Sequence, residues 1–143
     1  MIIKSYDVKK NKLDFLKKNF FLLYGENLGL KKEIKSFISA QIKQKDDSIE
    51  ILSLYESEIL DNEENFYNFV YSGSLFSNKK IITIYEASDK IVNKINDIYA
   101  KYPENVFLII FSNILEKKSK LRNFFEESEK TFCIPCYLDN ERD

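Results

Sequence analysis

Phe20-Phe21-Leu22-Leu23-Tyr24 is an unbroken apolar run that stops at Gly25. Consecutive apolar residues without polar alternation are typical of a strand that is buried on both faces of a parallel sheet. From residue 27 to about residue 44, apolar residues return at the spacing of an amphipathic helix. A buried strand, a glycine and a helix in this order predict the first unit of an α/β fold.

The alternation of strand and helix continues along the chain. Helices are indicated by an acidic start at residues 61–64, by Ser88 as a capping residue and by an apolar stripe within residues 117–130. Residues 1–19 suggest a strand-like start and a short basic helix. We therefore expect one α/β domain with a five-stranded, mainly parallel sheet and helices on both faces. The four further strands are predicted at residues 48–55, 80–85, 106–111 and 131–137.

Composition excludes several classes of protein. The chain has 143 residues, of which 44% are hydrophobic and 31% are charged, as in an ordinary globular domain. The 22 basic and 23 acidic residues give a net charge of -1, which argues against nucleic-acid binding driven by bulk charge. The chain start lacks the apolar segment of a signal peptide, and no apolar run is long enough to span a bilayer. We expect a cytoplasmic protein with no membrane contact.

Two cysteines, Cys133 and Cys136, form a C-x-x-C pair within an apolar run. A redox pair normally sits at the start of a helix, and a structural zinc site needs two further Cys or His ligands. The chain has no His and no other Cys. Residues three apart in an extended segment point to opposite faces. We therefore predict two buried, reduced thiols and no metal site.

The loop after the first strand stands where a phosphate-binding loop would stand. A P-loop has the pattern G-x-x-x-x-G-K-[ST], in which backbone N–H groups and the Lys bind phosphates and the hydroxyl holds magnesium. Here Gly25 and Gly29 are separated by three residues, and the lysines that follow are Lys31 and Lys32. Counted from Gly29, Leu30 occupies the Lys position. We interpret the loop as a degenerate nucleotide loop that does not bind ATP, and we expect no cofactor.

The strand ends offer little for catalysis. The third predicted strand is followed by a lone Glu86, and the fourth by Ser112 and Asn113. Ser and Asn commonly end strands, and without His we find no convincing pair of nucleophile and general base. We therefore predict no catalytic residues.

Leu75 and Phe76 stand out in the connection between a predicted helix and the third strand. They are flanked by Ser74 and Ser77, with Gly73 before them and lysines after them. A soluble protein seldom exposes a pair of large apolar side chains without a partner for them. One interpretation is an exposed apolar wedge; the other is a helix end whose Leu and Phe pack back onto the sheet.

Taken together, the chain resembles the N-terminal domain of the delta subunit of bacterial DNA polymerase III, a clamp-loader subunit. The likeness covers essentially the whole chain. The stretches that carry it are Phe-Phe-Leu-Leu-Tyr-Gly at 20–25, Ser-Leu-Phe-Ser at 74–77, Lys-Leu-Arg-x-Phe-Phe-Glu at 120–126 and Ile-Pro-Cys-Tyr at 134–137.

The resemblance implies an AAA+ fold that has lost nucleotide binding, with the first strand between the fourth and the fifth. It implies that Leu75 and Phe76, with Ser74, enter a pocket on the sliding clamp (the beta subunit) and favour the opened ring, while other subunits hydrolyse ATP. Partners would be the tau/gamma and delta prime subunits, with DNA bound only in the assembled complex. The subunit belongs to a DNA-directed DNA polymerase holoenzyme, but this domain would have no activity of its own.

The resemblance also has consequences for domain organisation. Residues 1–143 would form the AAA+-like domain, with lid and collar domains expected after residue 143 and absent here. The last residues, 139–143, resemble the start of another helix, so we expect a longer protein. Without the collar, this fragment should not assemble a pentamer.

Three alternatives remain open from the sequence. The first is an active P-loop NTPase with an atypical loop, against which Leu30 and Lys32 argue. The second is a receiver-like signalling domain, which needs an acidic pair after the first strand and an Asp at the end of the third. The third is a purely structural domain in which Leu75 and Phe76 are buried.

Overall fold

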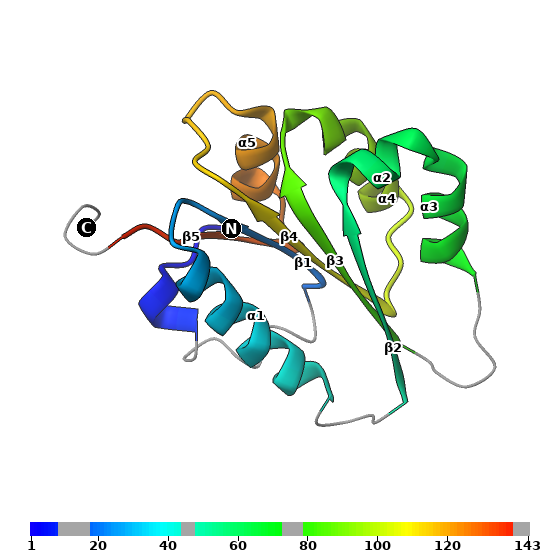
Figure 1. Cartoon of the computed structure of the whole chain (residues 1–143), viewed down its shortest axis with the longest axis horizontal. Helices are drawn as coiled ribbons and strands as arrows, with labels where there is room; N and C mark the ends of the chain where they lie inside the picture. The colour runs from blue at the N-terminus through cyan, green and yellow to red at the C-terminus, as the bar shows by residue number, and fades with distance from the viewer. Residues whose placement is uncertain (9–17, 44–47, 73–78, 139–143) are drawn as a thin grey trace.

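The computed structural model describes residues 1–8, 18–43, 48–72 and 79–138, and five strands form one sheet (Figure 1). The strand order is β2-β3-β4-β1-β5, and each pairing between these neighbours is parallel. This order confirms the predicted place of the first strand, between the fourth and the fifth. The strands are β1 (Phe20–Tyr24), β2 (Ile49–Tyr55), β3 (Lys79–Ala87), β4 (Val106–Ser112) and β5 (Thr131–Pro135).

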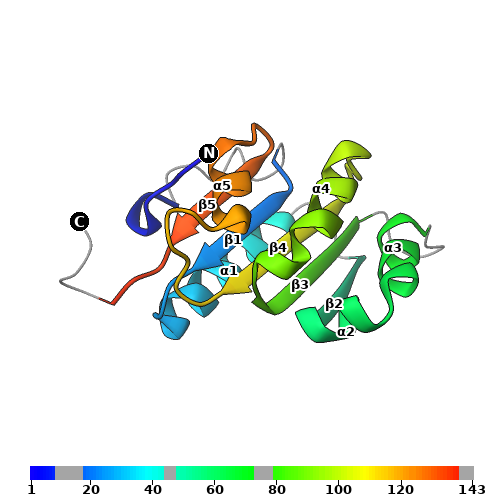
Figure 2. The same cartoon turned by 90° about the horizontal axis from the view of Figure 1, so that it is seen from above.

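Helices cover both faces of the sheet, as predicted (Figures 1 and 2). The connection from β1 to β2 crosses the sheet in the direction opposite to the later connections. Because such crossovers are right-handed, α1 lies on one face of the sheet and α2, α3, α4 and α5 lie on the opposite face. The helices are α1 (Leu28–Lys43), α2 (Glu56–Asp61), α3 (Glu63–Tyr71), α4 (Val92–Ala100) and α5 (Lys120–Glu127), with a 3-10 turn, η2 (Asp89–Ile91), before α4.

Several helix boundaries differ from the predicted ones. Of the acidic start predicted at residues 61–64, Asp61 ends α2 and Glu63 begins α3. The helix α2, which was not predicted, directly follows β2. The helix predicted at 117–130 is shorter, because the Ser119 hydroxyl caps it by accepting a hydrogen bond from the Arg122 N–H. Ser88 is a cap as predicted, although it opens η2 rather than α4 directly. The basic helix predicted before residue 19 falls largely outside the described residues.

The core consists of two apolar layers, one on each side of the sheet. Alternate residues of β1 supply both layers: Phe20 and Leu22 belong to the layer that contains α4 and α5, whereas Phe21 and Leu23 belong to the layer that contains α1. The same alternation separates the cysteines. Cys133 belongs to the first layer and Cys136 to the second, and both are free and buried. The prediction that the two thiols lie on opposite faces is confirmed.

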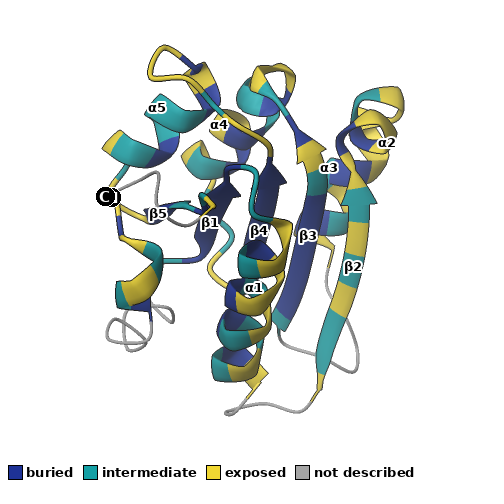
Figure 3. Ribbon diagram, turned by 60° about the vertical axis from the view of Figure 1, so that its left-hand side comes forward, coloured by how far each residue is buried: buried dark blue, intermediate teal, exposed yellow. Residues whose placement is uncertain are grey.

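The two edges of the sheet differ in how far they are covered. Beside β5, the N-terminal residues add a short parallel bridge, in which the Ile3 N–H donates to the Cys133 carbonyl (3.0 Å). This bridge confirms the strand-like start. The other edge strand, β2, alternates between intermediate and exposed residues, whereas β1 and β4 are buried along their length (Figure 3). Among the described helices, none is long and apolar enough to cross a membrane.

Candidate functional site

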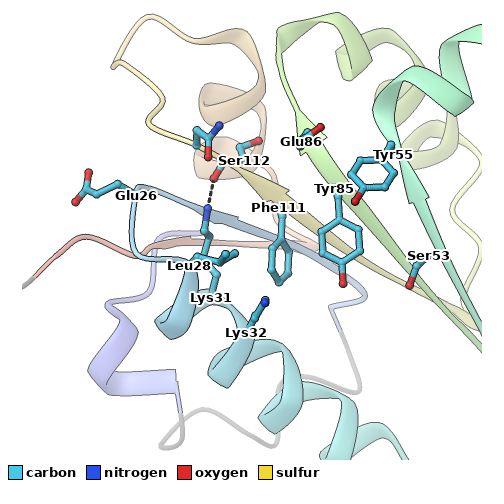
Figure 4. Close-up of a pocket in the computed structure, with 11 residues that line it drawn as sticks. Glu26, Leu28, Lys31, Lys32, Ser53, Tyr55, Tyr85, Glu86, Phe111 and Ser112 are labelled. Atoms are coloured by element: carbon cyan, nitrogen blue, oxygen red, sulfur yellow. Dashed lines mark hydrogen bonds between the residues drawn. The ribbon is translucent and has the colours of Figure 1, made fainter.

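A cavity of about 630 Å³ lies at the carboxyl edge of the sheet (Figure 4). Its walls come from the turn between β1 and α1, the first turns of α1, and the ends of β2, β3 and β4. Ligands of open α/β sheets bind at this edge, beyond the carboxyl ends of the strands. The predicted nucleotide loop therefore lies at the expected place. Whether it can bind phosphates depends on the contacts that its atoms already make.

Gly25 begins the loop in a conformation that other residues rarely adopt. Its φ is +118°, and a Cβ built on it would lie 2.2 Å from the carbonyl oxygen of Cys136. Both the dihedral angle and the close approach require glycine. The glycine of this loop thus lets the turn pack against the chain that follows β5.

Backbone N–H groups of the loop are already bound within the protein. Gly25 donates to the Asn113 carbonyl (2.9 Å), Asn27 to the Cys136 carbonyl (3.1 Å) and Leu28 to the Glu26 carbonyl (3.1 Å). The Leu30 N–H donates to Oδ1 of Asn27 at 3.0 Å, so that side chain caps α1. A P-loop works because such N–H groups point at phosphate oxygens. These four groups point at protein oxygens instead.

Lys31 stands at the position of the P-loop Lys, which the count from Gly29 did not reveal. Counted from Gly25 rather than from Gly29, it stands six residues on, where a P-loop has its Lys. Its ammonium does not project freely into the cavity. It donates a 2.8 Å hydrogen bond to the Ser112 carbonyl, and the residue is only 3% exposed (Figure 4). Burial lowers the pKa of Lys31 from its ordinary value of 10.5.

The residue after Lys31 is unsuited to magnesium. Lys32 is exposed and occupies the place of the Ser or Thr whose hydroxyl holds the ion in a P-loop. The acid at the end of β3, Glu86, is also exposed and has a φ of +55°. It lies where the pairing of β3 with β4 shifts between Ile84 and Ala87. In the described part of the chain, no group of three or more His, Cys, Asp or Glu side chains is placed to hold a metal ion.

Ser112, at the end of β4, is a structural residue. It is buried, and its hydroxyl donates to the Ala87 carbonyl at 2.8 Å while its own carbonyl accepts from Lys31. The bond to Ala87 joins the ends of β3 and β4 where their register shifts. The hydroxyl and the carbonyl oxygen of Ser112 thus both form hydrogen bonds within the fold.

An aromatic wall forms the far side of the cavity. The rings of Tyr85 and Phe111 lie 5.0 Å apart, and those of Tyr55 and Tyr85 lie 5.8 Å apart. The Lys35 ammonium donates to the Tyr85 hydroxyl at 3.0 Å and ties this wall to α1. The cavity thus combines aromatic surface with lysines, but two of the three lysines beside it are bound to protein oxygens.

The second predicted site, Ser74, Leu75 and Phe76, lies outside the described residues. The structure does place the residues on either side of it. Ser72 ends α3 and Lys79 begins β3, so this segment connects a helix to a strand as the sequence predicts. Lys80, the second residue of β3, is only 6% exposed, because its ammonium turns inward onto the end of α3.

Comparison with known proteins adds independent findings. The family model described as "DNA polymerase III, delta subunit" matches residues 21–136. Among solved structures, the DNA clamp loader delta protein of Bacillus subtilis is similar, with a TM-score of 0.60 and 12% sequence identity. That likeness covers 93% of this chain and 42% of the Bacillus protein, and at such low identity it bears on the fold. No curated protein matches the chain.

Proposed function

The chain belongs to the family of DNA polymerase III delta subunits, and on that premise we propose that it is the domain through which a clamp loader binds the sliding clamp. The observation that carries the proposal is the family match across residues 21–136, which includes Leu75 and Phe76. Membership of this family removes the support for a receiver-like signalling domain. The chain spans 42% of the length of the Bacillus protein, so the activity of a whole delta subunit is part of the proposal.

In this proposal, the domain is an AAA+ core that works without ATP. Support comes from the loop after β1, where the N–H groups of Gly25, Asn27, Leu28 and Leu30 are bound by protein oxygens. The ammonium of Lys31 is held by the Ser112 carbonyl. A nucleotide would have to displace these bonds before it gained any from the loop. We propose that hydrolysis belongs to other subunits of the loader.

Leu75 and Phe76 are proposed as the clamp-binding pair, with Ser74 at their rim. Burying each of these apolar side chains in a pocket contributes about 1.5–3 kcal/mol. Such a pair suffices as the centre of an interface, because a few buried side chains usually supply most of its binding energy. The domain favours ring opening if it binds the open clamp more tightly than the closed one.

The remaining parts of the proposal concern the longer protein. Lid and collar domains are proposed to follow residue 143, with the collar joining this subunit to the tau/gamma and delta prime subunits. The sliding clamp is the partner of the present domain, and DNA is contacted only in the assembled loader.

The test is a double substitution, Leu75→Ala with Phe76→Ala. It is expected to weaken binding to the sliding clamp of the same organism by about 2–5 kcal/mol, as for a hot-spot pair. The free energy of unfolding is expected to change little, because the pair contributes to the partner's interface rather than to this domain's core. Calorimetry with the clamp and urea denaturation measure the two quantities on one variant.

Ile114→Ala is the matched control, because Ile114 is an apolar residue that is 63% exposed on a different loop. It is expected to leave clamp affinity unchanged. Unchanged clamp affinity in the double variant, together with a large loss of stability, would show that Leu75 and Phe76 belong to the core. The clamp-binding proposal would then have no mechanism.

A further inference from the structure

One face of the sheet is only partly covered. Of the α-helices described, α1 alone lies on this face. A helix about 10–12 Å wide covers about two strands that lie about 4.8 Å apart. Among the described residues, the buried part of the α1 layer includes residues of β1, β4 and β5, but only Ile81 of β3 and none of β2. Figure 3 shows β2 beside α1 with no described helix over it, so this part of the face has room for a second helix.

Apolar side chains are exposed on the uncovered part. Ile51 of β2 is paired in register with Ile81, so its side chain projects on the same face as α1, and so does that of Tyr55 four residues later. Both side chains are half-exposed, as is Leu28 in the first turn of α1. Leu28 and Tyr55 line the same cavity. A soluble protein seldom gathers such side chains on one surface without a partner for them.

Two lysines of α1 lie beside these apolar side chains. Lys32 is exposed and lines the cavity, and Lys35 follows on the same side of the helix, where it donates to the Tyr85 hydroxyl at 3.0 Å. Within the described residues, neither lysine forms an ion pair. Glu26 and Glu86 also line the cavity, but their carboxylates point away from Lys32 (Figure 4). The positive charge along this side of α1 therefore suits a partner with negative charge.

We propose that this surface, called the open strip below, docks an amphipathic helix of a partner protein, with acidic residues along the side that faces α1. The open strip consists of Leu28, Lys32, Lys35, Ile51, Ser53 and Tyr55. An apolar stripe with helical spacing would cover Ile51 and Tyr55. Carboxylates beside that stripe would pair with the two lysines and fix the orientation of the helix.

A helix fits the open strip better than an added strand or a small anion does. A strand added to the edge of β2 bonds in the plane of the sheet, so it would leave the side chains that project from the face uncovered. A small anion in the cavity could meet Lys32, but it would not cover Ile51, which lies in the middle of β2 and outside the cavity lining. A helix laid beside α1 covers both.

The surface is separate from the proposed clamp site. The open strip extends to the carboxyl ends of the strands, where Tyr55 ends β2. Lys79, the described residue that follows the proposed clamp-binding pair in the sequence, begins β3 at the opposite edge of the sheet. The proposal therefore adds a second partner and does not depend on the first.

The probes are two synthetic amphipathic peptides of about 18 residues, whose helix of about 27 Å spans the length of β2. Both carry the same stripe of leucines, flanked by glutamates in one peptide and by lysines in the other. In fluorescence anisotropy titrations at low salt, the glutamate peptide is expected to bind the chain about tenfold more tightly than the lysine peptide. Added salt should reduce this preference, because it screens exposed charges.

Ile51→Thr tests the apolar part of the open strip. It keeps a β-branched residue in β2 and is expected to weaken binding of the glutamate peptide about fivefold or more. Ile114→Thr is the matched control, because Ile114 is exposed on a different loop, and it should leave binding unchanged. Urea denaturation of both variants checks that they are folded. Equal binding by wild type and Ile51→Thr would overturn the proposal.

A charge reversal tests the two lysines. Lys32→Glu with Lys35→Glu is expected to reverse the preference, so that the lysine peptide binds about tenfold more tightly than the glutamate peptide. If the double variant does not fold, Lys32→Glu alone should abolish the preference for glutamate. Lys117→Glu with Lys118→Glu is the control, because these lysines are exposed on the loop before α5, and it should leave the preference intact. A preference that Lys32 and Lys35 do not alter would overturn the proposal.

The remaining outcomes identify other occupants. Binding of neither peptide, or equal binding of both, would overturn the proposal. Self-association of the chain in sedimentation, lost in Ile51→Thr, would show that a second copy covers the open strip. Clamp affinity is expected to be the same in Ile51→Thr as in the wild type, and a loss would show that the clamp itself occupies this surface. Failure of the Leu75→Ala with Phe76→Ala test would remove the proposed function and leave the open strip untouched.

Discussion

The ammonium of Lys31 and the carbonyl oxygen of Ser112 lie 2.8 Å apart, and this buried hydrogen bond joins the first turn of α1 to the end of β4. The two residues are 81 positions apart in the chain. In a P-loop, the corresponding Lys reaches the phosphates of a nucleotide. Here the acceptor for the Lys31 ammonium is a carbonyl oxygen of the protein, that of Ser112.

Magnesium-ATP is expected not to bind specifically. A nucleotide would meet a loop in which the N–H groups of four residues are already bonded to protein oxygens. It would also meet Lys31, whose ammonium is already bonded, and Lys32 in place of the magnesium-binding hydroxyl. Calorimetric titration of the chain with magnesium-ATP should give no saturable heat. Saturable binding with micromolar affinity would restore the P-loop NTPase interpretation.

Stability should depend on Lys31 in the alkaline range. Burial lowers the pKa of Lys31 in the folded state below the ordinary 10.5, so between these two values the unfolded chain binds more protons than the folded one. The free energy of unfolding of the wild-type chain should therefore rise with pH in this window, relative to Lys31→Met. Urea denaturation at several pH values between neutrality and 10.5 measures the difference.

The control is the difference in the free energy of unfolding between the wild type and Lys31→Met. If this difference stays constant over the same pH range, the Lys31 ammonium is not destabilised by burial.

Two glycines of the loop should respond in opposite ways to alanine. Gly25→Ala places a Cβ 2.2 Å from the Cys136 carbonyl at a φ of +118°, so it should lower the free energy of unfolding by about 3 kcal/mol or more. Gly29→Ala lies within α1 and meets only Asn27 Oδ1 at 3.7 Å, so it should raise stability by about 0.5–1 kcal/mol. Denaturant unfolding of both variants measures this contrast, and equal effects would contradict it.

Both cysteines should be unreactive in the folded chain. Burial raises the pKa of each thiol, Cys133 and Cys136, to about 12, so little thiolate forms at pH 8. A thiol reagent such as DTNB should label neither residue at that pH until urea unfolds the chain, after which both should react. Rapid labelling of both thiols without denaturant, or stoichiometric zinc binding, would show that the pair is accessible.

Much of the fold follows from local patterns in the sequence. The run Phe20–Tyr24 is the strand that its composition predicts, because uniform apolarity requires burial on both faces. The opposite placement of Cys133 and Cys136 follows from the two-residue period of an extended chain. These inferences need only neighbouring residues, so they hold without knowledge of the rest of the molecule. The strand order came from the family resemblance, since local patterns do not state which strands are neighbours.

The tertiary structure alone decided the roles of the lysines. Lys31 and Lys80 resemble surface residues in the sequence, yet both are buried and each bonds to a carbonyl oxygen. The spacing of apolar residues in the sequence indicates which side chains suit an apolar environment. It does not indicate whether a polar side chain will meet a hydrogen-bond partner on a distant segment of the chain. A lysine becomes buried where packing brings an acceptor to its ammonium. For Lys31 that acceptor belongs to another element, the end of β4, and for Lys80 it belongs to the end of α3.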